Sequence, residues 1–160
     1  MKIGFGYDVH RLVRHRKLVL GGVQIPFHLG LEGHSDADVL IHAIVDSILG
    51  ALGLGDIGRH FPDTDPVWGG ADSTCFLQAS CELLKSHAYR IVNLDATVLA
   101  TEPKLVPFAA SITSSIAQHL QIESTLVNVK AKTTEGLGFI GEQKGMATYA
   151  VVSIEKTSHE

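Results

Sequence analysis

The stretch KIGFGYDVH, residues 2–10, restricts the fold more than any other part of the sequence, because its side chains alternate in character. Every second residue is apolar, namely Ile3, Phe5, Tyr7 and Val9. A period of two is typical of a half-buried β-strand. Asp8 and His10 therefore leave this strand together on the face opposite the apolar set, and only Gly4 and Gly6 precede them there. Two ionisable side chains placed side by side raise the question of what they bind.

The chain has the size and composition of one globular domain. It has 160 residues, of which 45% are hydrophobic and 19% are charged, so it can bury a sufficient core without disulfides. We therefore expect a single domain over residues 1–160. Cys75 and Cys81 form neither a metal-binding nor a secreted pattern, and we interpret both as small buried hydrophobes in a reducing compartment.

Charge and hydropathy argue against two classes of partner. The net charge is −4 and the basic residues form no cluster, so we do not expect nucleic acid to bind. No apolar run approaches the roughly 20 residues of a membrane span, and we expect the N-terminus to be a strand and not a signal peptide. These features favour a cytoplasmic protein without a membrane partner.

Expected helices and strands alternate along the rest of the chain. KLVLGGVQIP (residues 17–26) predicts a hairpin or a bulged strand pair around two glycines. Helices are expected from Ser35, with Asp38 completing a capping box, over residues 71–89, and from Pro103 onward. Strands are expected over residues 89–100, 125–133 and 147–156, and residues 53–73 are expected to form a long structureless loop. This order predicts an α/β (α+β) sandwich, in which a mixed β-sheet carries helices packed on one face.

A candidate metal site combines the first strand with the first helix. Asp38, His42 and Asp46 are four residues apart and share one polar helix face. His42 meets Asp8 and His10 if this helix packs across the strand. An Asp/His/His set suits Zn²⁺ and leaves a fourth coordination position open, as catalytic sites do. Spacing alone leaves a solvated strand end as an equally good interpretation.

Two other segments offer chemistry that their sequence leaves open. Asp56, Asp63 and Asp65 fit ordinary turn-forming residues, or a lid that holds a hydroxylated and phosphorylated substrate. Residues 132–135, followed by glycines, offer hydroxyls, amides and a lysine to phosphate oxygens, and Glu135 suits Mg²⁺ as a carboxylate ligand. A polar strand end with an ordinary turn explains the same residues.

The motifs GYDVHRL, GHSDADVLIHAIVDSILGALGLGDIGRHFPDTDP, GADS and VNVKAKTTEGLGF together resemble those of the 2-C-methyl-D-erythritol 2,4-cyclodiphosphate synthase family. The resemblance covers nearly the whole chain. It implies a homotrimer with active sites at subunit interfaces, in the cytoplasm or, in a eukaryote, in a plastid or apicoplast stroma. It also implies a phosphorus–oxygen lyase of the non-mevalonate isoprenoid pathway. The implied reaction converts 4-diphosphocytidyl-2-C-methyl-D-erythritol 2-phosphate to the 2,4-cyclodiphosphate and CMP.

The resemblance also assigns roles to individual residues. Zn²⁺ would bind Asp8, His10 and His42, while Glu135 would hold Mg²⁺ or Mn²⁺ with the substrate diphosphate. His34 and Thr133 would stabilise the transition state. The substrate would contact Asp8, Val9, His10, His34, Ser35, Asp56, Ile57, Gly58, Phe61, Pro62, Asp63, Thr64, Asp65 and Phe139. A neighbouring chain would add Ala100, Thr101, Glu102, Pro103, Lys104, Leu105, Val106, Lys132, Thr133, Thr134 and Glu135.

One position departs from the family pattern. Glu142 stands where an arginine is usual; in the family that arginine and Phe139 line a cavity near the trimer axis that can hold an isoprenoid diphosphate. The change removes a positive charge that such a ligand would meet, unless Lys144 partly replaces it. Two alternatives to the synthase remain at this stage. A zinc-dependent phosphodiesterase or other hydrolase would give linear products, and an isoprenoid-binding protein with a structural zinc would need a fourth protein ligand.

Overall fold

The computed structural model describes residues 1–157. The strands are β1 (Lys2–Val13), β2 (Leu18–Leu20), β3 (Val23–Ile25), β4 (Gly30–Leu31), β5 (Tyr89–Leu99), β6 (Val127–Lys132) and β7 (Gly145–Lys156). The α-helices are α1 (Val39–Leu52), α2 (Ile57–His60), α3 (Thr74–Ser86), α4 (Ala109–Leu120) and α5 (Gly138–Gly141). Short 3₁₀ turns are η1 (Pro66–Trp68), η2 (Val106–Phe108) and η3 (Ser124–Leu126).

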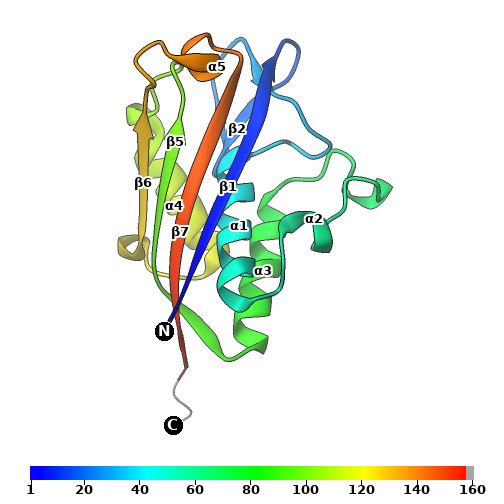
Figure 1. The fold of residues 1–160 in the computed structure, drawn as a ribbon, viewed down its shortest axis with the longest axis vertical. Coiled ribbons are helices and arrows are strands. Elements are labelled where there is room, and N and C mark those ends of the chain that lie inside the picture. Colours follow the sequence, from blue (N-terminus) through cyan, green and yellow to red (C-terminus); the bar gives the residue numbers. More distant parts are fainter. Residues whose placement is uncertain (158–160) are drawn as a thin grey trace.

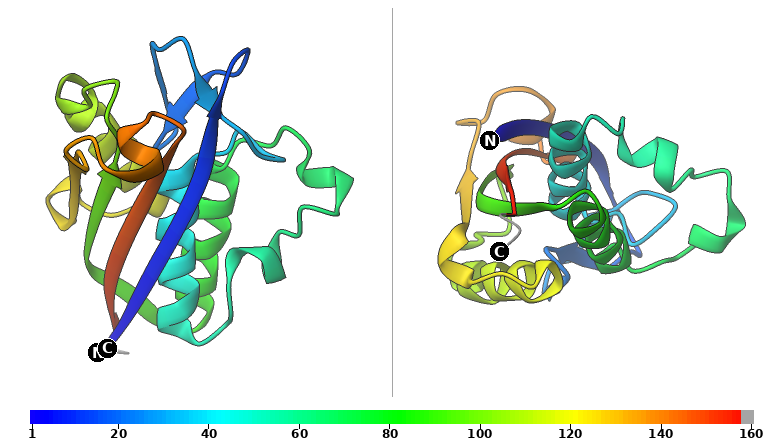
Figure 2. Two further views of the ribbon diagram at one scale, coloured as in Figure 1. Left: turned by 45° about the horizontal axis from the view of Figure 1, so that its top comes forward. Right: turned by 90° about the horizontal axis from the view of Figure 1, so that it is seen from below.

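The main sheet has the strand order β4-β1-β7-β5-β6, and β2 pairs with β3 in a separate hairpin. Only β5 and β6 are parallel, since α4 lies in the connection between them, so the sheet is mixed. Helices α1, α3 and α4 lie on one face of this sheet (Figures 1 and 2). The α+β sandwich and the glycine hairpin predicted from the sequence are therefore confirmed.

Two glycines let α1 lie directly on β1. A Cβ atom on Gly4 would stand 1.8 Å from the carbonyl oxygen of Ser47, and one on Gly6 would stand 1.9 Å from that of Ala43. No side chain fits at either position without moving the helix backbone. The glycine face of β1 is therefore the face that meets the helix, and it carries Asp8 and His10 toward α1.

The apolar set of β1 lies on the opposite face, which α1 does not cover. Ile3 is 69% exposed and Phe5 is 61% exposed. The period of two is confirmed, but the interpretation of the apolar set as the buried half of the strand is wrong within one chain. The exposed large apolar residues on this open face of β1 and β7 are Ile3, Phe5, Tyr7, Val9, Tyr149 and Val151. A contiguous apolar surface of this kind marks an interaction site.

Helix α1 begins later than the sequence predicted. Its N-cap is Asp38, whose carboxylate accepts hydrogen bonds from amides of the first turn, including Ile41 N at 3.0 Å. Ser35 is not part of a capping box, because its hydroxyl lies beside His42 and Ala37 has a left-handed φ of 58° that turns the chain before the helix.

Helix α4 begins at Ala109 and not at Pro103, so that prediction was wrong. The amide of Ala100 still donates to the carbonyl of Lys132 at 3.0 Å, which keeps the chain extended beyond β5. The proline near the helix start is Pro107, in the first turn of η2. The buried stripe that the four-residue spacing predicted is present at Ile112, Ile116 and Leu120.

Residues 53–73 are ordered, which corrects the expectation of a structureless loop. They contain α2 and η1. Phe61, Trp68 and Phe76 form an aromatic cluster with ring centroids 4.6 to 5.4 Å apart, which anchors the segment on α3. Aromatic packing thus orders residues 53–73 although they are rich in turn-forming residues. Sequence periodicity does not indicate packing of this kind.

Two negative expectations concern thiols and membranes. Cys75 and Cys81 are free; Cys81 is buried, as the interpretation of a small buried hydrophobe expects, whereas Cys75 is only half-buried. Within residues 1–157 no helix has both the length and the apolar character needed to cross a bilayer.

Candidate active site

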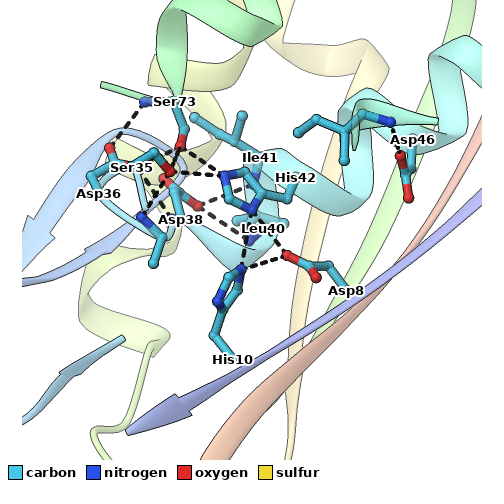
Figure 3. A network of polar contacts seen from close by, with 12 residues as sticks. Asp8, His10, Ser35, Asp36, Asp38, Leu40, Ile41, His42, Asp46 and Ser73 are labelled. Carbon is cyan, nitrogen blue, oxygen red and sulfur yellow. Dashed lines mark hydrogen bonds and ion pairs between the residues drawn. The ribbon is translucent and has the colours of Figure 1, made fainter. Parts of the chain in front are cut away.

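Asp8, His10 and His42 converge at the place where β1 meets the first turns of α1 (Figure 3). The Oδ2 atom of Asp8 lies 2.9 Å from His10 Nε2 and 3.0 Å from His42 Nδ1. The two ring nitrogens are 3.1 Å apart. The structure thus brings together the three residues that the sequence proposed as metal ligands.

The other two acids of the helix pattern do not join this triad. The Asp38 carboxylate is buried and accepts from Gly22 N at 2.7 Å, which ties α1 to the β2–β3 hairpin. The Asp46 carboxylate accepts from Ile57 N at 2.7 Å and holds the start of α2 (Figure 3). The four-residue spacing predicted one polar helix face for all three residues, but Asp38 precedes the helix as its N-cap and Asp46 faces the start of α2.

The donor atoms of the triad fit a cation. His10 Nδ1 lies 2.6 Å from the carbonyl oxygen of Glu32, so this nitrogen carries the hydrogen and Nε2 presents its lone pair to Asp8 and His42. A carboxylate oxygen and two ring nitrogens then face one another, and they need a shared proton or a cation between them. One carboxylate and two imidazoles suit a divalent metal and leave a coordination position open.

The electrostatics of the triad also favour positive charge. Burial alone raises the pKa of Asp8, but when His10 and His42 are protonated their hydrogen bonds and positive charge outweigh it and hold this pKa far below its usual range. Burial alone lowers the pKa of His10, but the hydrogen bond and negative charge of Asp8 outweigh it, so the pKa of His10 is raised.

A cavity of about 350 Å³ opens beside the triad. Its wall combines the end of β4, the start of α1, helix α2 and the aromatic cluster. The lining residues are His10, Gly33, His34, Ser35, His42, Ile57, Gly58, Phe61, Asp63, Trp68 and Phe76. Six residues that the resemblance assigned to substrate binding outside the triad are therefore found together: His34, Ser35, Ile57, Gly58, Phe61 and Asp63.

Two other residues of the expected substrate-binding set stabilise the segment of residues 53–73. The Asp56 carboxylate accepts from Arg59 N at 3.0 Å and caps α2, and the Asp65 carboxylate accepts from Val67 N at 3.0 Å and caps η1. The turn-forming interpretation of these two aspartates is confirmed. Pro62 and Thr64 lie between them in the chain but do not line the cavity.

The second expected set lies elsewhere in the same chain. Asp8 is level in the sheet with Thr148, Val98 and Ala131 on successive strands. Three interstrand spacings separate β1 from β6, which is roughly 14 Å. Residues 132–135 run from the last residue of β6 into the turn after it, and residues 100–106 follow β5 beside it, so one chain does not bring them to the triad. Leu105 and Val106 line a separate cavity of about 140 Å³.

The end of β6 is open to solvent. Lys132, Thr133 and Glu135 are all exposed. Thr133 Oγ1 donates to Glu135 Oε1 at 2.7 Å, and Glu135 has a left-handed φ of 53°. These groups are exposed, and no helix or strand within residues 1–157 covers them.

A third region contains the family departure noted in the sequence. Val9 and Phe139 line a cavity on the far side of β1 together with Lys144. Lys144 Nζ forms an ion pair with Glu142, so the charge of this lysine is countered within its own turn.

Sequence reasoning missed two residues of the site. Ser73 Oγ lies 2.9 Å from His42 Nε2, and Asp36 accepts hydrogen bonds from both the hydroxyl and the amide of Ser73 (Figure 3). Both residues stand inside motifs already singled out, GADS and GHSD. The signal was present, but nothing in the spacing indicates that residue 73 meets residue 42.

Comparison with known proteins gives consistent matches over the whole chain. A family model described as the YgbB family matches residues 1–155. The chain is 55% identical over 159 residues to the 2-C-methyl-D-erythritol 2,4-cyclodiphosphate synthase of Syntrophotalea carbinolica, covering 99% of this chain and 97% of that protein. It is 57% identical over 156 residues to the protein of the same name from Geobacter sulfurreducens, covering 98% and 99%.

Solved structures agree with these sequence matches. The bifunctional IspDF of Campylobacter jejuni superposes with a TM-score of 0.95 at 43% identity, covering 98% of this chain and 42% of that longer chain. A CDP complex of IspF from Plasmodium falciparum superposes with a TM-score of 0.86 at 38% identity, covering 98% and 97%.

Proposed function

The chain belongs to the YgbB family, and from this membership we propose that it cyclises 4-diphosphocytidyl-2-C-methyl-D-erythritol 2-phosphate to 2-C-methyl-D-erythritol 2,4-cyclodiphosphate. The observation that carries the proposal is the Asp8, His10 and His42 triad at the wall of a cavity, in a chain matched over its length by synthases of this name. In the reaction an oxygen of the 2-phosphate attacks the β-phosphorus. The bond from that phosphorus to the α–β bridging oxygen breaks, and CMP leaves with this oxygen.

The reaction brings two anions together. Two unit charges 4 Å apart repel by about 4 kcal/mol at an effective dielectric near 20, and the phosphates of this substrate carry several charges. The nucleophile is already ionised at neutral pH, so no nucleophilic triad or strong base is required. Positioning and charge neutralisation are what the protein must supply.

The triad supplies the ligands for one cation. Asp8, His10 and His42 would hold Zn²⁺, and Glu135 would bind Mg²⁺ or Mn²⁺ together with the substrate diphosphate. Bound divalent cations neutralise and polarise the phosphates. His34 stands at the cavity wall, where its ring would meet the reacting phosphates, and Thr133 is its proposed counterpart in transition-state stabilisation.

We place the two halves of the site on different chains of a homotrimer. Support comes from the open apolar face of β1 and β7, which has no cover within residues 1–157, and from the separation of the triad from residues 132–135. Residues 100–106 would hold the cytidine end of the substrate. Binding of CDP by solved relatives supports a nucleotide site of this kind. A cytoplasmic location stays a prediction.

The test is incubation with the CDP-linked substrate, with and without a metal chelator, followed by phosphorus NMR and product mass. We expect a cyclic diphosphate and CMP, both abolished by the chelator and restored by Zn²⁺ with Mg²⁺. A linear diphosphate product would instead identify a hydrolase and contradict the proposal.

A further inference from the structure

His42 presents two nitrogens with opposite tasks. Nδ1 faces Asp8 Oδ2 at 3.0 Å, on the side where a metal would bind. Nε2 faces Ser73 Oγ at 2.9 Å on the other side of the ring. A neutral imidazole carries one hydrogen, so only one nitrogen presents a lone pair to a metal. The carboxylate of Asp8, taken alone, draws this hydrogen to Nδ1 and blocks the metal-binding atom.

The hydrogens on the far side of the ring can be assigned one by one. The Asp36 carboxylate accepts from Ser73 N at 3.1 Å through Oδ2 and from the Ser73 hydroxyl through Oδ1. An ionised carboxylate has no hydrogen to give, so the single hydroxyl hydrogen of Ser73 is directed at Asp36. Ser73 Oγ then has only lone pairs left for His42, and His42 Nε2 must be the donor.

Neighbouring residues fix the positions of Asp36 and Ser73 in these hydrogen bonds. Ser73 is fully buried at the start of α3, and Ser35 Oγ lies 3.4 Å from Ser73 Oγ and 3.3 Å from His42 Nε2. Asp38 N donates to Asp36 Oδ1 at 3.2 Å, which fixes the orientation of that carboxylate. The contacts join α1 to α3, and Figure 3 shows them on the side of the imidazole away from Asp8.

We propose that Asp36 and Ser73 form a hydrogen-bond relay that keeps the hydrogen of His42 on Nε2 and so leaves Nδ1 free to bind the metal. Both are positioning residues, since neither touches the metal position. The relay is the counterpart of the Glu32 carbonyl, which fixes His10 with its free nitrogen toward the same point. Partners of this kind orient metal-bound imidazoles and raise their basicity. The inference rests on the metal site of the proposed function and adds the groups that prepare it.

The direct test is the tautomer of His42 in metal-free protein at pH 8, read from long-range proton–nitrogen spectra of ¹⁵N-histidine-labelled chain and assigned with His42→Ala. We expect a protonated, pyrrole-type Nε2 and a pyridine-type Nδ1 in the wild type. A pyrrole-type Nδ1 would show that Asp8 holds the imidazole hydrogen on Nδ1. This result from the wild-type protein alone would overturn the proposal.

Asp36→Asn reverses the relay. With its oxygen toward Ser73 N and its nitrogen toward Ser73 Oγ, the amide frees the serine hydrogen for His42 Nε2 and gives up the hydrogen bond from Asp38 N. We expect the tautomer to shift toward Nδ1–H and zinc affinity, measured by chelator competition, to fall about 10–100-fold. Ser73→Ala should weaken zinc binding to a similar extent with a mixed tautomer. If Asp36 merely holds the start of α3, the tautomer ratio will stay at its wild-type value, and that result overturns the proposal.

Asp72→Asn is the matched control. Asp72 is the neighbouring acid in the same motif and caps Thr74, with no contact to His42. We expect wild-type tautomer and zinc affinity from it. If Asp72→Asn lowered zinc affinity as much as Asp36→Asn does, the relay would be overturned. Failure of the wild type to bind zinc would refute the metal site of the proposed function, while the tautomer would still report on the relay.

Discussion

The two halves of the proposed active site differ in how far one chain prepares them. The triad half is built on β1 and α1, is partly buried, and has each imidazole fixed by a contact on its far side. The half at residues 132–135 projects from the end of β6, and most of its side chains are exposed. Two strands of the sheet, β7 and β5, lie between β1 and β6 and so between the two halves.

This difference has a physical reason. A metal site needs ligands held at fixed distances before the cation arrives, and burial with fixed hydrogen bonds provides that rigidity. Groups that meet a flexible diphosphate can remain solvated until the substrate and a second chain cover them. One chain thus completes the rigid half, and in the proposed trimer assembly would supply the remainder.

The largest effect is expected from removing a ligand of the prepared half. His42→Ala should lower zinc affinity at least about 100-fold, more than loss of a supporting partner does, and should reduce CMP release to background even with saturating Mg²⁺. Glu135→Ala is the matched comparison and should leave zinc affinity unchanged, because its carboxylate lies on the other half. Equilibrium competition with a chromogenic chelator measures both. Near-normal turnover of His42→Ala would remove the metal role of the triad.

The next effect concerns assembly without disturbing the triad. Phe5 points away from α1 on the open face, so Phe5→Lys places charge in the proposed interface and should give monomers by analytical ultracentrifugation. Zinc affinity should stay within about 2-fold of the wild type, because the metal half needs one chain only. Ser114→Lys, on the exposed side of α4, is the control and should remain assembled. A Phe5→Lys chain that assembles as the wild type does would place the interface elsewhere.

A smaller effect is expected at the buried cap of α1. Asp38→Asn keeps the cap but sets an amide hydrogen against the amide of Gly22, so we expect a loss of about 1–3 kcal/mol in unfolding free energy. Burial and the charge of Asp36 raise the pKa of Asp38, although the amides of Gly22 and Ile41 oppose this. An acid with a raised folded pKa loses stability as pH rises from its unfolded value toward the folded one.

The unfolding free energy of the wild type should therefore exceed that of Asp38→Asn by more near pH 4 than at pH 7. Urea denaturation of both proteins at each pH gives the difference. An advantage that grows as pH rises would show that the helix amides dominate and that the pKa is lowered.

The smallest effect is expected at Thr148, which lies level with Asp8 in the sheet. Its hydroxyl is buried and has no hydrogen-bond partner among the described residues. Thr148→Val keeps the shape and should raise the unfolding free energy by about 1 kcal/mol, with zinc affinity unchanged. Destabilisation on urea denaturation would indicate that the hydroxyl is satisfied in solution and belongs to the support of the triad.

Periodicity predicted the elements that depend on local pattern. It gave the hairpin at residues 17–26, the helices carrying Phe76 and Ile112, and the mixed sheet. It failed where a distant contact decides. The glycine face of β1 is buried because α1 packs against Gly4 and Gly6. The alternation of the sequence does not indicate which of the two faces the helix covers.

The candidate site followed the same division. The triad was predictable because strand and helix periods place Asp8, His10 and His42 on facing surfaces. Asp38 and Asp46 share the spacing of His42 but not its position beside the triad, because α1 begins at Val39 with Asp38 as its N-cap and Asp46 holds the start of α2. Ser73 was missed because its contact with His42 spans 31 residues and depends on the packing of α3 against α1.

The measurement that tests the two-chain site most directly is subunit mixing. Asp8→Ala and Glu135→Ala chains, each inactive alone, are unfolded together in equal amounts, refolded, and assayed for CMP release. If each site takes Asp8 from one chain and Glu135 from its neighbour, random trimers should recover about a quarter of wild-type activity. Verified mixed trimers with no recovered activity would contradict a site shared between chains.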